Sequence, residues 1–163
     1  MDLTARDIMS STYQTLRPNL PIPEAISLFR SANELEQRRV FGMMVVDAAQ
    51  ELVGMLSMFD ILLAIRPKHI AIWGEMEDLL PEGLFSAALD RLRSFEVGDL
   101  MTRELITITP ETPLLVIMDL MIRHHVRRIP VVQERSILGI VYISDLFYHL
   151  LQGFMDERGP RSG

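Results

Sequence analysis

The sequence predicts an α+β protein made of two copies of one strand–helix–strand–strand–helix unit, packed with pseudo-twofold symmetry and separated by a helical insert. The first observation is a repeat: the Asp-Ile-Met-Ser motif at 7–10 returns 92 positions later as Asp-Leu-Met-Thr, and Pro21 returns as Pro113 at the same offset. The second is hydrophobic periodicity, which changes between strand and helix spacing in the same order in each copy. Two copies with so long a period indicate a symmetric pair and not a solenoid, which needs several short repeats.

Each copy is expected to open with a short helix that ends near Met9 or Met101. Alternating apolar and polar residues then predict half-buried strands at 12–16 and 105–109. A proline-initiated helix follows, and in the second copy Thr112 occupies the position of an N-cap before Pro113 at the first helical position. One apolar stripe marks that helix: Leu114, Ile117, Met118, Met121, Ile122 and His125.

The second half of each copy is predicted to be a strand pair followed by a helix. The paired strands cover 40–46 and 126–132 with their successors, and the closing helices cover 58–65 and 144–152. Gly54 and Gly139, 85 positions apart, lie at the start of the later strands. Glycine inside a strand indicates a bulge or the close approach of another backbone.

The insert between the copies is too long for a turn and is predicted to be helical. Leu84, Phe85, Ala88, Leu89 and Leu92 mark one amphipathic helix, and 70–80 is predicted to contain a second. We expect the insert to pack against the pair or against another subunit. The tail from Asp156 onward is expected to be disordered.

Composition limits the function. The chain has 163 residues, of which 48% are apolar, and a net charge of −6, which argues against sequence-independent binding to nucleic acid. Cysteine is absent, so disulfide and thiolate chemistry are excluded and a reducing compartment is favoured. The apolar run at 114–118 is far shorter than the roughly 20 residues that a bilayer requires, and no secretory leader opens the sequence. We expect a soluble cytoplasmic protein without a membrane partner.

Signatures of catalysis are missing from the sequence. It contains no Gly-x-Gly-x-x-Gly, Walker lysine loop, Gly-x-Ser-x-Gly or His-Glu-x-x-His motif. A metal site at His124 and His125 is not expected, because neighbours on a helix point about 100° apart and no third ligand is clustered with them. We therefore expect a protein that is not an enzyme, binds no metal and requires no cofactor.

The Ser57-Met58-Phe59-Asp60 motif has two interpretations. The first is a capping box, in which a Ser at the N-cap and an acid three residues later satisfy the free N–H groups of a helix start. The second is a ligand site, because a helix N-terminus attracts phosphate and a carboxylate beside it accepts the vicinal hydroxyls of a ribose. The residues alone leave both open.

A short basic run at 123–128 is the other candidate. Arg123 and His124 are explained as cations that complement a helix C-terminus. Arg127 and Arg128 lie beyond the helix, on opposite faces if the chain is extended, so at least one is available to bind a phosphate.

These motifs resemble the CBS domain family, and the two copies together resemble a CBS pair. The resemblance is carried by the two Asp-x-Met openings, by Val-Arg-Arg-Ile-Pro-Val-Val at 126–132, and by the Gly-x-x-Ser-x-x-Asp and Gly-x-x-x-x-Ser-Asp segments that begin at Gly54 and Gly139. It covers nearly everything outside the insert and the tail. It implies a first CBS repeat at 1–66, an insert at 67–96, a second repeat at 97–153 and a flexible tail at 154–163.

The resemblance implies an adenine-nucleotide sensor whose clefts between repeats hold AMP, ADP, ATP or S-adenosylmethionine. The aspartates would bind ribose, the serines of the same motif would face phosphate or ribose, the residues after the opening Met would line the pocket, and the basic residues would reach phosphate. The nucleotide-binding residues implied in this way are Ser10, Ser57, Asp60, Thr102, Arg127, Arg128, Ile129, Ser144 and Asp145.

The sequence departs from the family pattern at several positions. Phe41 and Gly42 stand where the second copy has its arginines, Met44 replaces the family's proline, and Tyr142 replaces a small hydroxyl residue. We therefore expect one competent pocket and not two equal ones. The leading hypothesis is a stand-alone regulatory CBS pair that senses an adenosyl ligand, forms a homodimer through its CBS pairs and signals to a separate partner. The alternative is a structural dimerisation module without a nucleotide.

Overall fold

The fold was analysed in a computed structural model that describes residues 2–66 and 82–156. The predicted insert helix at 70–80 and nearly all of the tail lie outside the described residues. The chain forms two compact units, each built from segments that are distant in sequence. Unit 1 joins Met1–Tyr13 to Ile106–Gly163, and unit 2 is Gln14–Leu105. Each unit therefore takes its opening helix from one repeat and its strands from the other.

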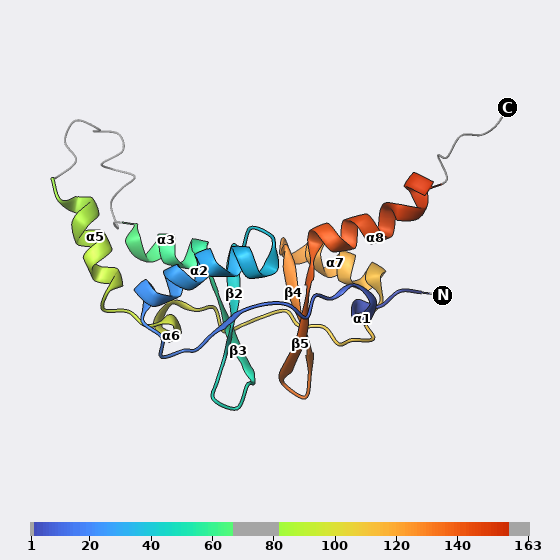
Figure 1. Cartoon of the computed structure of the whole chain (residues 1–163), viewed down its shortest axis with the longest axis horizontal. Helices are drawn as coiled ribbons and strands as arrows, with labels where there is room; N and C mark the ends of the chain where they lie inside the picture. Colours follow the sequence, from blue (N-terminus) through green and yellow to red (C-terminus); the bar gives the residue numbers. More distant parts are fainter. Residues whose placement is uncertain (1, 67–81, 157–163) are drawn as a thin grey trace. The chain divides into compact units, whose positions relative to one another are not determined.

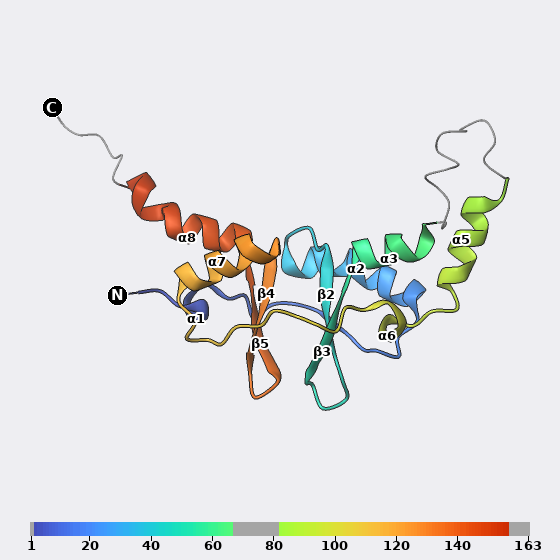
Figure 2. The same cartoon turned by 180° about the vertical axis from the view of Figure 1, so that it is seen from behind.

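Unit 2 contains a three-stranded sheet with strand order β1-β2-β3. Strand β1 (Thr15–Leu16) runs parallel to β2 (Gly42–Val46), which is antiparallel to β3 (Leu52–Ser57). The helices of the unit are α2 (Ile22–Glu36), α3 (Met58–Ile65), α5 (Leu84–Leu92) and α6 (Val97–Leu100). Figure 1 shows α2 and α3 beside the end of the hairpin at which β3 finishes. In the view from behind, α6 lies beside the elements of the first repeat (Figure 2).

The core of unit 2 contains the all-buried strand β2 and the inward faces of the helices. Ile22, Ala25 and Phe29 from α2 pack on it at helical spacing, and Val97 and Met101 supply contacts from the second repeat. Backbone hydrogen bonds from Ile22 to Phe95 and from Val97 to Leu20 attach the α6 segment to the start of α2. The helix predicted at 84–92 is present as α5, which buries Ala88 and Leu92 and packs against α3.

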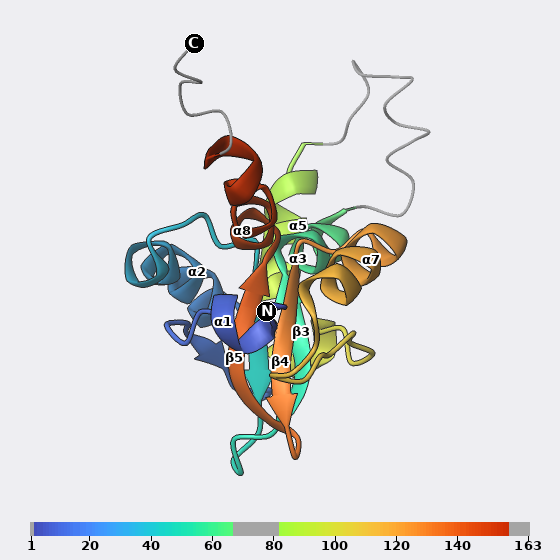
Figure 3. The ribbon, with the colours of Figure 1, turned by 90° about the vertical axis from the view of Figure 1, so that its right-hand side faces the viewer.

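Unit 1 contains a two-stranded antiparallel hairpin of β4 (Arg128–Gln133) and β5 (Ser136–Tyr142). Its helices are α1 (Ala5–Ile8), α7 (Leu114–His124) and α8 (Ile143–Asp156). Figure 3 shows α1 beside the β4–β5 hairpin. Ile8 from α1 joins Ile117, Ile129 and Val141 in one buried cluster. The opening helix of the first repeat is thus part of the core formed by the second.

Several sequence predictions about local structure need correction. The strands predicted at 12–16 and 105–109 are reduced to β1 and to a single bridge between Ile108 and Val131, since Pro18 and Pro110 follow and proline has no N–H to donate to a ladder. Helix α7 begins one residue later than predicted, with Pro113 as its N-cap.

The α7 stripe is also only partly buried. Leu114, Ile117 and Met121 are buried, whereas Ile122 is 63% exposed. His125 lies beyond the helix as a left-handed C-cap with φ of 53°.

Gly54 and Gly139 lie inside β3 and β5 and not at the predicted start of these strands, but both form the predicted close approaches and both are next to a bulge. The register shifts after Val45↔Gly54 in unit 2 and after Val131↔Gly139 in unit 1. A Cβ at Gly54 would lie 2.8 Å from the carbonyl oxygen of Thr102, and one at Gly139 would lie 3.0 Å from that of Ser10. The glycines let the opening segment of the other repeat lie directly on the hairpin.

Candidate functional site

The junction of β3 and α3 carries a capping box, as predicted. Ser57 is the N-cap of α3, and its hydroxyl accepts a hydrogen bond from the Asp60 backbone N–H at 3.1 Å. In return, Oδ2 of Asp60 accepts one from the Ser57 backbone N–H at 2.9 Å. This exchange satisfies two of the free donors at the helix start and fixes the direction of the carboxylate.

Thr102, from the other repeat, lies against this junction. It forms a two-way backbone bridge with Met55, with N···O distances of 2.9 Å in both directions. Its hydroxyl donates to Oδ1 of Asp60 at 3.4 Å. Three residues of the predicted site therefore meet inside unit 2, and Thr102 reaches them because Gly54 leaves room for its backbone.

The Asp60 carboxylate retains hydrogen-bonding capacity in this arrangement. Oδ2 is occupied by the cap, whereas Oδ1 has only the long contact to Thr102 within the part of the chain that the structure describes. An ionised carboxylate oxygen accepts two hydrogen bonds, and Asp60 is only half-buried. The cluster of Ser57, Asp60 and Thr102, called here the Asp60 cluster, can accept a pair of vicinal hydroxyls without breaking the cap. The two interpretations of the motif are thus compatible.

Unit 1 repeats the backbone part of this arrangement with Ser10 in the place of Thr102, whereas the Ser10 hydroxyl forms its hydrogen bonds with the backbone of Thr12. Ser10 forms a two-way backbone bridge with Ile140, at 2.8 and 2.9 Å. Ser144, which is exposed, and Asp145, which is half-buried, lie in the first turn of α8 directly after β5. Tyr142 occupies the position that Ser57 has in unit 2, and it is 8% exposed. The two units therefore differ most at the residue that precedes the helix.

The predicted phosphate-binding residues lie at the start of β4 in unit 1. Arg127 is exposed, and its carbonyl oxygen accepts a hydrogen bond from the Ile143 N–H at 2.8 Å, which places its backbone at the start of α8. Arg128 is half-buried and stands opposite Tyr142 in the hairpin. The Ile129 side chain is fully buried in the core, so only its backbone is available to a ligand.

The remaining residues of the basic run have structural roles. Arg123 donates from Nε to Asp119 Oδ2 at 2.8 Å across one turn of α7. His124 lies in the last turn of the helix, where a cation complements the dipole. Residues 2–66 and 82–156 contain no cluster of three His, Cys, Asp or Glu side chains that could hold a metal ion.

The exchange of opening segments between repeats could not be read from the sequence. The offsets show which residues correspond, but Asp60 and Thr102 belong to different copies and no pattern pairs them. The glycines are the available signal: Gly54 and Gly139 indicated a close backbone approach without naming the partner, which is the residue after Met101 in one case and the residue after Met9 in the other.

A fold in which strand hairpins pair with exchanged opening segments defines a tandem-repeat module, and comparison with known proteins identifies its family. The chain belongs to the CBS domain family, which it matches at residues 5–67 and 97–152. It is 46% identical over 67 residues to the mitochondrial CBS domain-containing protein CBSX3 of Arabidopsis thaliana, covering 40% of this chain and 32% of that protein. It is 29% identical over 143 residues to the CBS domain-containing protein YhcV of Bacillus subtilis, covering 88% and 82% of the two chains.

Solved structures show the same fold. The CBS-pair protein CBSX2 from Arabidopsis thaliana matches with a TM-score of 0.72 and 23% identity, covering 98% of this chain and all of that one. A structure of CBSX2 in complex with AMP matches with a TM-score of 0.67 and 24% identity, covering 93% and 98%. The α+β class and the two CBS repeats predicted from the sequence are thereby confirmed. The chain spans about a third of the length of CBSX3, 32%.

Helices long and apolar enough to cross a membrane are not found among the described residues.

Proposed function

We propose that this chain is a regulatory CBS pair that senses an adenosyl ligand, namely AMP, ADP, ATP or S-adenosylmethionine, and signals to a separate protein. The observation that carries the proposal is the Asp60 cluster. There the helix cap holds Oδ2 of the Asp60 carboxylate, and Oδ1 accepts a hydrogen bond from the hydroxyl of Thr102 in the other repeat. The AMP bound by CBSX2, which has the same fold, supports an adenine nucleotide as the ligand.

In unit 2, Asp60 would accept the ribose hydroxyls, while Ser57 and Thr102 line the site. The corresponding set in unit 1 is Asp145 for ribose, with Ser144 and Ser10 beside it. Arg127 and Arg128 would bind phosphate there, because guanidinium groups form paired, charge-assisted hydrogen bonds with phosphate oxygens. The Ile129 backbone would complete this set.

The two sets differ in chemistry, which supports the expectation of one competent pocket. Unit 2 has the small Ser57 hydroxyl but Phe41 and Gly42 where unit 1 has Arg127 and Arg128. Unit 1 has the arginines, but the bulky Tyr142 takes the place of the serine. A ligand that carries phosphate is expected to favour the arginine-bearing set, and one recognised through its ribose is expected to favour the Asp60 cluster.

Isothermal titration calorimetry with each of the four nucleotides tests the proposal. Asp60→Asn keeps one carbonyl acceptor but removes the charge, so ligand at the Asp60 cluster should bind at least tenfold more weakly, since hydrogen bonds to charged groups are worth about 1.5–3 kcal/mol. Asp99→Asn is the matched control, because Asp99 occupies the same position in the capping box of α6 and accepts from the Glu96 N–H at 2.8 Å. Asp145→Asn makes the same test in unit 1.

We also propose that the protein forms a homodimer. Helices α7 and α8 enclose an apolar groove of about 280 Å³ whose rim includes Ile122, Ile143 and Phe147, at 63%, 45% and 54% exposure. An exposed apolar surface of this kind is typical of an interface. Sedimentation equilibrium measures the dimer, and Phe147→Asp should shift it toward monomer.

The alternative function is a structural dimerisation module, and one observation favours it. The same capping box occurs at Thr4 and Asp7 and at Glu96 and Asp99, where it caps short helices. If none of the four nucleotides produces heat of binding or a thermal shift, the Asp60 cluster is a helix cap and the structural function is the correct one.

A further inference from the structure

The loop between α2 and β2 in unit 2 contains two residues that have no counterpart in unit 1. Both α2 and α7 end at a residue in the left-handed conformation, Gln37 with φ of 52° and His125 with φ of 53°. In unit 1 a valine follows this cap directly, whereas in unit 2 Arg38 and Arg39 stand between the cap and the matching Val40. Both inserted residues are therefore cations.

Beyond the valine, the two loops are attached to the next helix in the same way. The Phe41 carbonyl oxygen accepts a hydrogen bond from the N–H of Met58, the first residue of α3, at 2.8 Å. The Arg127 carbonyl oxygen accepts one from the N–H of Ile143, the first residue of α8, also at 2.8 Å. The order of residues is thus Arg-Arg-Val in unit 2 and Val-Arg-Arg in unit 1. Each unit keeps two consecutive arginines in this loop, but those of unit 2 come before the valine.

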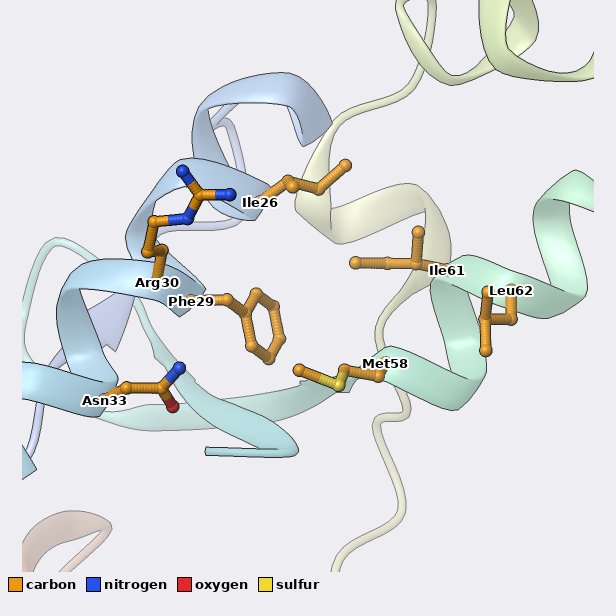
Figure 4. Close-up of a pocket in the computed structure, with 7 residues that line it drawn as sticks. All are labelled: Ile26, Phe29, Arg30, Asn33, Met58, Ile61 and Leu62. Carbon is orange, nitrogen blue, oxygen red and sulfur yellow. The ribbon is translucent and has the colours of Figure 1, made fainter. Parts of the chain in front are cut away.

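The residue that follows Arg39 is held firmly in place. The Val40 N–H donates to Asn33 Oδ1 at 2.7 Å, and the Val40 side chain is buried. Asn33 of α2 and Met58 of α3 both line the groove between these helices (Figure 4). Arg39 lies two residues before the carbonyl group that is bonded to Met58, and two residues of extended chain span at most about 7 Å. The long Arg39 side chain therefore starts beside the first turn of α3, which contains Asp60.

Arg39 is the cation of this loop that is available to a ligand. Its side chain is exposed, and its guanidinium forms neither a hydrogen bond nor an ion pair with residues 2–66 or 82–156. Arg38 is half-buried and already has an interaction partner in the chain. Arg103 follows Thr102 of the Asp60 cluster, but it donates to the Gly98 carbonyl oxygen of α6 at 3.3 Å.

A purely structural role does not explain Arg39. Cations near the end of a helix complement its dipole, and α2 has no basic residue in its last turn, whereas α7 has Arg123 and His124. This effect falls off within the last turn of the helix. Arg39 lies two residues beyond the C-cap Gln37, so its charge contributes little to the stability of α2.

We infer that Arg39 binds the phosphate of a ligand held at the Asp60 cluster, and that this ligand is an adenosine phosphate and not S-adenosylmethionine. The inference rests on the proposed nucleotide-binding function and names the ligand class for unit 2. A guanidinium forms paired, charge-assisted hydrogen bonds with phosphate oxygens. It repels the positively charged sulfonium of S-adenosylmethionine. In unit 2 the phosphate contact is thus supplied by the loop before the strand, and it adds to recognition through the ribose.

The test compares AMP with adenosine, two ligands that differ only in the phosphate. Isothermal titration calorimetry uses the full chain with Arg127→Gln and Asp145→Asn, which disable the unit 1 set, as the parent protein. AMP should bind this parent about tenfold more tightly than adenosine, the lower end of the range for hydrogen bonds to a charged group. S-adenosylmethionine should bind more weakly than AMP. Adding Arg39→Gln should remove the preference for AMP while adenosine keeps its affinity.

Arg103→Gln in the same parent is the matched control, because it removes another exposed arginine, the one that follows Thr102. It should keep the preference for AMP. The inference is overturned if Arg39→Gln keeps this preference, if Arg103→Gln is the variant that loses it, or if S-adenosylmethionine binds the parent more tightly than AMP. A lower melting temperature of Arg39→Gln without ligand, together with an unchanged preference, would assign the residue to the stability of the loop and also overturn the inference.

The proposed function fails in a different way. If adding Asp60→Asn to the parent leaves AMP binding unchanged, or if none of the nucleotides binds the wild-type protein, the Asp60 cluster is not a nucleotide site, and the inference falls with it. If Asp60→Asn weakens both AMP and adenosine but Arg39→Gln affects neither, the function stands and only the assignment of Arg39 is wrong.

Discussion

Replacing Gly54 or Gly139 by alanine is predicted to push the opening segment away from the hairpin in each unit. At Gly54 the new Cβ would lie 2.8 Å from the Thr102 carbonyl oxygen and 2.9 Å from Met101 Sδ. At Gly139 the nearest atom is Met9 Sδ at 2.9 Å, with the Ser10 carbonyl oxygen at 3.0 Å. The methionine side chains can move, but the carbonyl groups belong to backbone held by the hydrogen bonds to Met55 and Ile140.

The magnitude follows from the contact distances. An extra methyl group forced into a packed contact costs about 1–3 kcal/mol of unfolding free energy. For a chain of this size that corresponds to a fall in melting temperature of about 2–12 °C. Gly54→Ala should cost more, since its closest contact is to backbone and not to a flexible side chain. It should also weaken nucleotide binding at the Asp60 cluster, because Thr102 is displaced from Asp60.

Gly153→Ala provides the matched control. Gly153 lies in α8 with nothing within 4 Å of the added Cβ, so alanine should stabilise the helix by up to about 1 kcal/mol. Differential scanning calorimetry of the three variants gives the comparison. If Gly54→Ala and Gly139→Ala melt at or above the wild-type temperature, the opening segments do not lie on the hairpins in the way described. The explanation that Gly54 lets Thr102 reach Asp60 would then be wrong.

Three further predictions concern the stability of individual contacts. Asn33→Ala should lower the unfolding free energy by about 1–3 kcal/mol in urea titrations, because Asn33 Oδ1 accepts from the Val40 N–H at 2.7 Å and that donor would be left unpaired; a loss below a few tenths would show that water replaces the side chain. Glu134 and Arg135 form a two-residue hairpin turn with φ of 51° and 72°. Asn followed by Gly favours a type I′ turn, so replacing Glu134 by Asn together with Arg135 by Gly should raise the unfolding free energy by about 1 kcal/mol. No gain would mean that the turn is not of type I′. Burial raises the pKa of Tyr13 above 10.0, so the contribution of the neutral Tyr13 hydroxyl to stability is fully present below pH 10 and is lost as the pH rises through the folded-state pKa. The fall in unfolding free energy at alkaline pH should therefore be shallower in Tyr13→Phe. An unchanged fall would show that other groups cause it.

The repeat architecture could be predicted because the same motifs and the same hydrophobic periodicity occur twice in the sequence. Helix α3 was predicted to its exact bounds, since Ser57 starts it with a capping side chain and its apolar residues recur at helical spacing. The bulges beside Gly54 and Gly139 were predicted for a similar reason, because glycine weakens a strand unless a bulge or a neighbouring backbone requires it. Signals of this kind depend only on residues that are close in sequence, so they can be recognised without knowledge of the tertiary contacts.

The exchange of opening segments depended on contacts that sequence does not display. Thr102 reaches Asp60 across 42 positions, and nothing in either motif indicates that the partner is in the other copy. His125 was predicted to lie on the apolar stripe of α7 because its spacing fits that stripe. The helix ends one residue earlier, and His125 is its C-cap in the left-handed conformation. Ile129 was placed in the site through its neighbours in the motif, and the structure adds that its side chain lies in the core, so only its backbone is available to a ligand.

The proposal that an aspartate oriented by a helix cap binds the ribose of an adenosyl ligand is tested most directly by a crystal structure of the protein grown with AMP. The account predicts that both ribose hydroxyls lie within about 3.2 Å of the Asp60 or the Asp145 carboxylate, with the cap of the adjacent helix intact. Density for AMP away from both carboxylates, or a protein that stays unliganded at saturating concentrations of each of the four nucleotides, would contradict it.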